Sequence, residues 1–189
     1  MKPTLVVMLK VPRAGRVKTR LGRDIGMTAA AWWFRHQVAR LLRRIEDPRW
    51  RIVLAVAPDV EGLRSRVWPA RFDRWPQGSG SLGDRMARMM RRAAGPVCVI
   101  GADVPGITRT GLAKAFATLG DHDAVFGPAP DGGYWLIGVK TGSKLRKGAL
   151  IGVRWSSEHA LADSRAALVP YRIGLVDMLA DVDTIDDLP

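Results

Sequence analysis

Residues 4–21 of the chain read TLVVMLKVPRAGRVKTRL. The apolar run 4–9 is typical of a buried strand, and the loop after it holds Gly15 and five basic side chains, counted from Lys10 to Arg20. Turn amides beside Lys and Arg bind phosphate oxygens, and ligands of an open α/β sheet bind at the carboxyl ends of its strands. The stretch therefore predicts a phosphate-binding loop at a sheet edge, although a solvated basic loop would explain the same residues.

Expected strands and helices alternate along the rest of the chain. Apolar runs predict strands over residues 51–57, 72–75, 97–100, 124–126, 134–139 and 169–173. Periodic stretches predict helices over residues 27–45, 61–67, 109–119 and 157–167, and one that follows the loop 77–86 and ends near residue 94. This alternation indicates an α/β fold in a single domain over 1–189. We expect a three-layer α/β/α arrangement in which helices cover both faces of a mixed, mostly parallel sheet.

The formal net charge of +12 is unevenly distributed. Residues 1–95 hold 21 basic and 7 acidic side chains, whereas residues 96–189 hold 9 and 11. A basic half favours an anionic partner: a nucleotide, a phosphorylated substrate or nucleic acid. Nucleic acid is the least favoured of these, because it leaves the aspartates described below without a role.

Other features narrow the class of protein. No apolar run approaches the roughly 18–20 residues that a membrane helix needs, and basic residues from Lys10 onward interrupt any signal-peptide core. Cys98 is the single cysteine, it lies in an apolar run, and no Cys/His cluster has zinc spacing. We therefore expect a cytoplasmic protein without a membrane span or a zinc site.

Three aspartates in two segments are candidate metal ligands. Asp103 directly follows the expected strand 97–100, where a carboxylate could hold Mg²⁺ or Mn²⁺ on nucleotide phosphates. Asp181 and Asp183 face the same way if their segment is extended, so they could supply the second side of that site. A turn aspartate at 103 and a helix N-cap around Asp183 are the structural alternatives.

Two loops are candidate ligand contacts. In the stretch 131–134, paired glycines allow close backbone approach, Asp131 could bind metal or a substrate hydroxyl, and Tyr134 could stack. A tight hairpin turn explains the same residues. The glycine-rich loop 77–86 could accept phosphate or ribose or be a plain connection, and Ser156 or Ser157 is a candidate N-cap.

Three well-known nucleophile and phosphate-binding motifs are absent from the sequence. It contains neither a Gly-x-Ser-x-Gly elbow nor a Gly-x-x-x-x-Gly-Lys-Ser/Thr loop, and no Gly-x-Gly-x-x-Gly follows the first expected strand. This inventory favours catalysis by positioning and by metal-assisted charge stabilisation.

Six motifs, taken in order, resemble the glycosyltransferase-A-like proteins known as selenodomain-associated transferases. They are the basic loop 10–21, then LGDRM at 82–86, GADVP at 101–105, GPAPDGGY at 127–134, Trp155-Ser156, and DVDT at 181–184. The resemblance implies a nucleotide-diphospho-sugar transferase fold. It also implies kinship with 2-phospholactate guanylyltransferase and molybdenum cofactor guanylyltransferase.

The resemblance also implies roles for individual residues. Nucleotide binding is expected at Lys10, Gly15, Lys18, Thr19, Arg20, Gly83 and Arg85; metal binding at Asp103, Asp181 and Asp183; acceptor binding at Asp131, Gly132, Gly133 and Tyr134; and catalysis at Asp103, Asp131 and Lys18. The first loop has fewer glycines than is usual in nucleotidyltransferases. Val104 and Pro105 follow Asp103 where many glycosyltransferases of this fold carry Asp-x-Asp.

These observations predict a transferase that uses Mg²⁺ or Mn²⁺, a nucleotide or nucleotide-sugar donor and a small-molecule acceptor. Glycosyl transfer is the first interpretation. The alternatives are nucleotidyl transfer with release of pyrophosphate, and a basic nucleic-acid-binding or non-catalytic nucleotide-binding protein. The acceptor, the donor base and the oligomeric state stay open.

Overall fold

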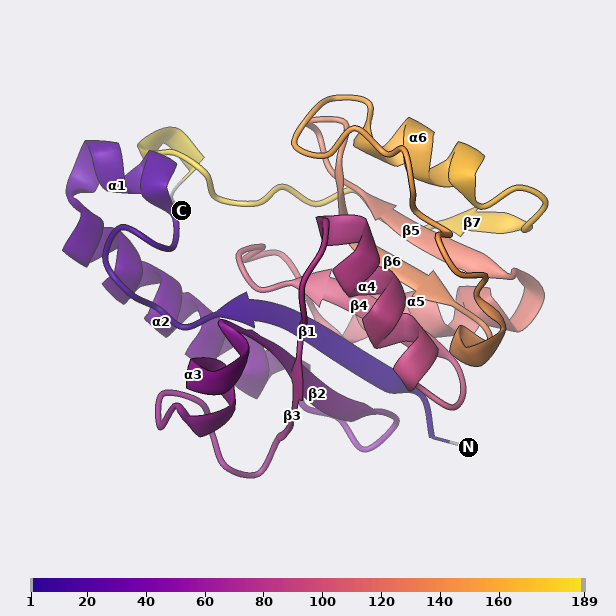
Figure 1. The fold of residues 1–189 in the computed structure, drawn as a ribbon, viewed down its shortest axis with the longest axis horizontal. Helices are drawn as coiled ribbons and strands as arrows, with labels where there is room; N and C mark the ends of the chain where they lie inside the picture. Colours follow the sequence, from indigo (N-terminus) through magenta and orange to yellow (C-terminus); the bar gives the residue numbers. More distant parts are fainter. Residues whose placement is uncertain (1, 188–189) are drawn as a thin grey trace.

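A seven-stranded sheet forms the centre of this computed structural model, which describes residues 2–187 (Figure 1). In sheet order the strands are β3 (Asp73–Pro76), β2 (Arg51–Ala57), β1 (Thr4–Lys10), β4 (Val97–Gly101), β6 (Tyr134–Val139), β5 (Ala124–Pro128) and β7 (Ile173–Leu175). β6 runs antiparallel to both of its neighbours, and the other pairs are parallel. The expected mixed, mostly parallel sheet is confirmed, and its departure from parallel order lies at β6, the strand that follows the turn at Asp131.

Helices cover both faces of the sheet (Figure 1). α2 (Met27–Ile45) and α5 (Arg109–Asp121) pack on one face, and α4 (Leu82–Arg92) and α6 (Ala160–Ala167) on the other. The remaining elements are α1 (Thr19–Ile25), α3 (Asp59–Arg64) and the 3-10 turns η1 (Gly142–Lys144) and η2 (Ile185–Asp187). Within residues 2–187, no helix combines the length and apolarity that crossing a membrane requires.

β1 shows how the sequence builds the two cores. Its side chains alternate, so that Leu5, Val7 and Leu9 enter the core beneath α2 and α5, while Val6 enters the core beneath α4. Each fully buried aliphatic side chain stabilises the fold by about 1.5–3 kcal/mol. Burial on both faces explains why the central strands are continuous apolar runs.

The carboxyl ends of the parallel strands meet at one edge of the sheet. The basic loop follows β1, the loop 77–81 follows β3, and Asp103 follows β4. Asp131 follows β5 at the same edge, because β5 runs in the direction of β4. Segments far apart in the sequence therefore share this edge, as the position of the first loop predicted.

The structure differs from the local expectations in four places. α1 was not predicted, because Leu21 and Gly22 are its only buried residues and leave no apolar stripe. α3 begins at Asp59, directly after Pro58, and ends at Arg64. β7 occupies 173–175 rather than 169–173, since residues 168–171 turn back through a bond from the Tyr171 amide to the Leu168 carbonyl (2.8 Å).

The start of α6 is the fourth correction. The helix begins at Ala160, and neither Ser156 nor Ser157 caps it. Ser157 Oγ instead donates to the Arg154 carbonyl (2.7 Å), which closes a turn before the helix. Ser156 has a φ of 58°, in the left-handed region, so the chain bends there instead of continuing into a helix.

Candidate active site

A pocket of about 820 Å³ lies at the carboxyl edge of the sheet. Its walls come from the ends of β1 and β4, the start of β6, the loop before α4 and the segments 155–160 and 181–183. The predicted site residues that line it are Lys10, Lys18, Thr19, Arg20, Arg85, Asp103, Asp131, Gly133, Tyr134, Asp181 and Asp183. Volumes of about 300–1,000 Å³ are typical of small-molecule sites.

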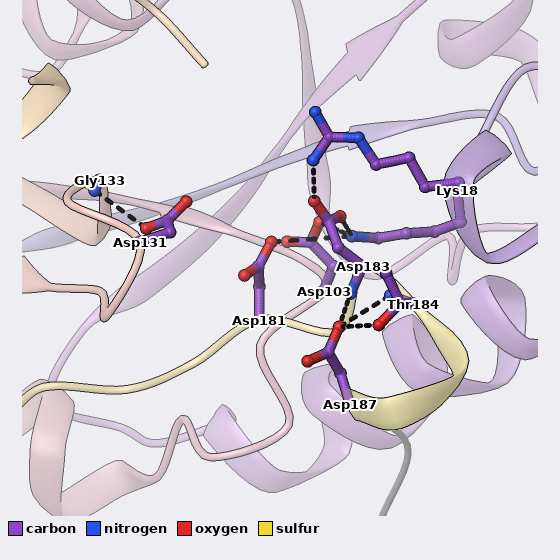
Figure 2. Close-up of polar contacts among 9 residues, drawn as sticks. Lys18, Asp103, Asp131, Gly133, Asp181, Asp183, Thr184 and Asp187 are labelled. Carbon is purple, nitrogen blue, oxygen red and sulfur yellow. Dashed lines mark hydrogen bonds and ion pairs between the residues drawn. The ribbon is translucent and has the colours of Figure 1, made fainter. Parts of the chain in front are cut away.

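Lys18 lies at the centre of the acidic side of this pocket (Figure 2). Its Nζ atom is 2.5 Å from Asp103 Oδ2, 2.9 Å from Asp183 Oδ1 and 3.9 Å from Asp181 Oδ2. The side chain is only 8% exposed. Arg20 completes the group from the surface, with Nη1 donating to Asp183 Oδ2 at 2.8 Å.

The C-terminal segment 176–187 brings the late aspartates to the pocket. It crosses the sheet edge from β7 towards α1 (Figure 1). The amides of Val176, Leu179 and Val182 donate in turn to the carbonyls of Phe126 (2.9 Å), Pro128 (3.1 Å) and Asp103 (3.2 Å). The segment is therefore held by β5 and by the residue that carries the first carboxylate.

Val182 sets the direction of its two neighbours. Its side chain is buried against Leu21 and Ala30, so the flanking Asp181 and Asp183 project to the opposite side, towards Lys18. Beyond them, Asp187 Oδ2 accepts from the amides of Asp183 (2.9 Å) and Thr184 (2.7 Å) and from Thr184 Oγ1 (2.9 Å) (Figure 2). The expected same-facing pair is thus present, and its direction is set by burial of the residue between.

The pKa values of the charged side chains around Lys18 shift in opposite directions. Burial raises the pKa of Asp181, and the nearby carboxylates Asp103 and Asp183 raise it further. Burial also opposes ionisation of Asp183, but hydrogen bonds and charge from Lys18 and Arg20 outweigh it and lower its pKa. Burial opposes the charge of Lys18 as well, yet Asp103 and Asp183 hold its pKa above the ordinary value.

The same three carboxylates have the chemistry of a divalent cation site. One oxygen from each of Asp103, Asp181 and Asp183 lies within 4.8 Å of the others. Carboxylate oxygens are the hard ligands that Mg²⁺ and Mn²⁺ prefer. A lysine ammonium already lies among them, which shows that the arrangement accommodates positive charge. The residues therefore fit the expected metal.

Asp131 stands on the other side of the pocket (Figure 2). Its Oδ1 accepts from the Gly133 amide at 2.9 Å, and the side chain stays exposed. Gly132 has a φ of 82°, and an added Cβ would lie 2.2 Å from the Glu158 carbonyl oxygen, so only glycine fits there. Gly132 therefore shapes the turn and does not line the pocket.

Tyr134 lines the pocket with its ring while its hydroxyl is held elsewhere. The hydroxyl lies 3.1 Å from Ser164 Oγ, and the ring meets Phe126 and Trp155 edge-on. Burial raises the pKa of this hydroxyl. The ring can therefore form a wall against a ligand, but the hydroxyl is not free to act as an acid or base.

Two further predicted residues, Gly15 and Gly83, lie outside the pocket. Gly15 has a φ of 74°, which bends the basic loop. Gly83 lies in the first turn of α4, where an added Cβ would lie 2.7 Å from Trp155. Ser81 and Asp84 form a reciprocal capping box at this helix start, typically worth about 1 kcal/mol.

The pocket residues that were not among the predicted site residues include Arg16, Gln77 and Trp155. Arg16 lies in the basic loop, and its charge was a usable signal. Gln77 is buried, and its Nε2 donates to the carbonyls of Leu9 (3.1 Å) and Ala55 (2.8 Å), which ties the loop before α4 to β1 and β2. Trp155 was predicted only as part of a motif, because its contact with Tyr134 depends on how segment 142–159 folds back.

The fold is that of nucleotide-diphospho-sugar transferases and nucleotidyltransferases. The chain belongs to the family described as "Uncharacterized protein conserved in bacteria (DUF2064)", which it matches over residues 40–157. None of the curated proteins compared with the chain matches it.

Several solved structures share the fold of this chain. A proposed nucleotide-diphospho-sugar transferase from Desulfovibrio desulfuricans G20 is similar, with a TM-score of 0.86 and 28% identity over 99% of this chain and 85% of that one. Two more distant structures share the fold. They are Rv0371c from Mycobacterium tuberculosis H37Rv in complex with manganese (TM-score 0.57, 15% identity, 99% of this chain and 95% of that one) and CMP:2-keto-3-deoxy-manno-octonic acid synthetase with CTP (0.61, 13%, 97% and 94%).

Proposed function

We propose that this protein is a metal-dependent transferase that takes a group from a nucleotide-sugar donor to a small-molecule acceptor. The observation that carries the proposal is the meeting of the basic loop 10–21 with three carboxylates in one pocket. Cationic side chains bind the phosphates of such a donor, and carboxylates hold the cation that bridges them.

In this proposal the basic loop binds the donor. Lys18 and Arg20, with Arg16 at the rim, would bind the diphosphate, and the loop amides after Gly15 would add uncharged donors. Lys10 and Arg85 line the same pocket beside the loop before α4, where the nucleoside would lie. Arg85 is oriented there because its Nε donates to the Gly80 carbonyl at 3.1 Å.

The metal would be held by Asp103 together with Asp181 or Asp183. Bound there, Mg²⁺ or Mn²⁺ supplies positive charge that stabilises the leaving phosphate. The manganese complex of a protein with the same fold supports this assignment.

Asp131 would act on the acceptor. It is exposed, lines the pocket opposite the carboxylate group, and is kept in one orientation by the Gly133 amide. A carboxylate in that place can accept the proton of an attacking hydroxyl. Tyr134 and Trp155 would form the apolar wall against which the acceptor lies.

Nucleotidyl transfer is the second candidate, favoured by the fold neighbour that holds CTP. In that reaction a nucleoside triphosphate would bind the same loop and leave pyrophosphate. We also propose that the chain is related to the selenodomain-associated transferases and to the two guanylyltransferases named above.

The test is a thermal-unfolding panel of nucleoside triphosphates and of GDP- and UDP-sugars, with and without Mg²⁺ or Mn²⁺, followed by assays of the released product. A ligand that binds the native state raises its stability. A metal-dependent shift with a nucleotide-sugar and release of nucleoside diphosphate would support glycosyl transfer. Pyrophosphate release from a triphosphate would favour the second candidate, and no shift with any nucleotide would contradict both.

A further inference from the structure

Lys18 serves as the internal counter-cation of the proposed metal ligands. Its single ammonium faces Asp103, Asp181 and Asp183 at 2.5, 3.9 and 2.9 Å. Arg20 reaches the far oxygen of Asp183 and is largely exposed, whereas Lys18 is buried. In the absence of other ligands, Lys18 therefore provides most of the compensation for three clustered negative charges.

The backbone aims Lys18 at this position. Its φ of 45° and ψ of 49° lie in the left-handed region, and Ser156 is the only other non-glycine residue with positive φ among residues 2–187. The residue sits at the N-cap of α1 without a side-chain cap to stabilise that conformation. Such strain persists only where surrounding contacts compensate it, and here the compensating contacts are the ion pairs.

A divalent cation and this ammonium would compete for the same oxygens. Mg²⁺ requires ligand oxygens at about 2.0–2.1 Å, whereas the ammonium already bonds Asp103 Oδ2 and Asp183 Oδ1. Two cations that share these oxygens would repel each other at short range in a partly buried site. Lys18 therefore opposes metal binding to the free protein as long as it stays among these carboxylates.

A donor phosphate would give Lys18 a new partner. The pocket that holds the carboxylates also holds Arg16, Thr19 and Arg20 of the basic loop, so phosphates bound there lie within reach of the ammonium. We infer that Lys18 exchanges the three carboxylates for the donor phosphates, so that the protein takes its divalent cation together with the donor, as a metal–phosphate complex, and binds the free ion weakly. This inference rests on the proposed function.

The experiment is a titration of the whole 189-residue chain with Mn²⁺ alone, in which electron paramagnetic resonance measures the free ion. The variants are Lys18→Met and Lys18→Gly, the second because glycine adopts a φ of 45° without strain and so protects the fold. Lys10→Met is the matched control, because Lys10 lines the same pocket and forms no ion pair within the described residues. Asp103→Asn reports whether bound Mn²⁺ occupies this site.

We expect Lys18→Met and Lys18→Gly to bind Mn²⁺ at least about tenfold more tightly than the unaltered protein, a factor within the usual range of coupling between ligands. Lys10→Met should change the affinity by less than about threefold, because a charge without a direct contact acts only through screened electrostatics. Equal or weaker binding by the Lys18 variants, with binding that Asp103→Asn abolishes, would overturn the exchange and leave the metal site standing. Failure of every form to bind Mn²⁺ would overturn the proposed metal site and this inference with it.

Discussion

The Lys18 ammonium lies 2.5 Å from Asp103 Oδ2, so the loop after β1 is joined directly to the residue after β4. β1 and β4 are neighbours in the sheet, and both of their carboxyl ends open into the pocket. This contact joins the proposed phosphate-binding and metal-binding halves of the site into one unit. A change to either half is therefore expected to alter ligand binding at the other.

Asp103→Asn is expected to remove the metal-dependent part of nucleotide binding. The amide keeps the shape of the side chain but loses the negative charge that a divalent cation requires. We expect the loss of the Mg²⁺- or Mn²⁺-dependent thermal shift and a fall in turnover of about 10²-fold or more, typical of removing one electrostatic stabiliser. Asp73→Asn is the control, since Asp73 is an exposed carboxylate of β3 outside the pocket. A normal shift in Asp103→Asn would contradict the assignment.

Val182→Ala is expected to loosen the C-terminal segment and weaken metal binding. Val182 is 2% exposed and packs against Leu21 and Ala30. Truncation of a buried aliphatic side chain typically costs about 1–3 kcal/mol, and here the lost packing holds Asp181 and Asp183 in place. The Mn²⁺ affinity and the free energy of unfolding in denaturant should both be lower than in Val169→Ala, in which the replaced side chain is 65% exposed. An unchanged Mn²⁺ affinity would show that the aspartates do not depend on this anchor.

Gly132→Ala is expected to lower the free energy of unfolding far more than an alanine in a left-handed backbone conformation would by itself. Gly132 and Gly152 share a φ of 82°, but only at Gly132 would the new Cβ meet backbone, 2.2 Å from the Glu158 carbonyl oxygen. Gly152→Ala should cost about 1–2 kcal/mol from its left-handed conformation, and Gly132→Ala clearly more. Urea unfolding of the two variants makes the comparison, and equal losses would contradict the steric argument.

The ion pair between Asp163 and Arg154 is expected to make stability depend on pH in the acid range. A hydrogen bond from Arg154, at 2.8 Å, lowers the pKa of Asp163 from 3.8 to about 2. Because the folded pKa is depressed, the contribution is present above pH 3.8 and is lost as the pH falls towards 2. The free energy of unfolding, measured from pH 5 to pH 2, should therefore fall more steeply for the unaltered protein than for Asp163→Asn. Parallel curves would contradict the pair's contribution.

Much of the fold could be predicted from local patterns. Apolar runs predicted the central strands, and the position of Asp103 after the strand 97–100 predicted that it lies at the ligand-binding edge of the sheet. α1 and the start of α6 could not be predicted in this way. α1 buries few side chains, and Ser157 uses its hydroxyl to close a turn with Arg154 instead of capping a helix.

The sequence by itself determined the class of fold, the basic character of the first loop and the alternation that lets Asp181 and Asp183 face one way. Each of these depends on neighbours within a few residues, where backbone geometry and side-chain period are sufficient. Only the tertiary structure decided that Lys18 meets carboxylates 85 to 165 positions further along the chain. That meeting depends on the order of strands in the sheet and on burial of Val182, which are properties of packing across the whole molecule.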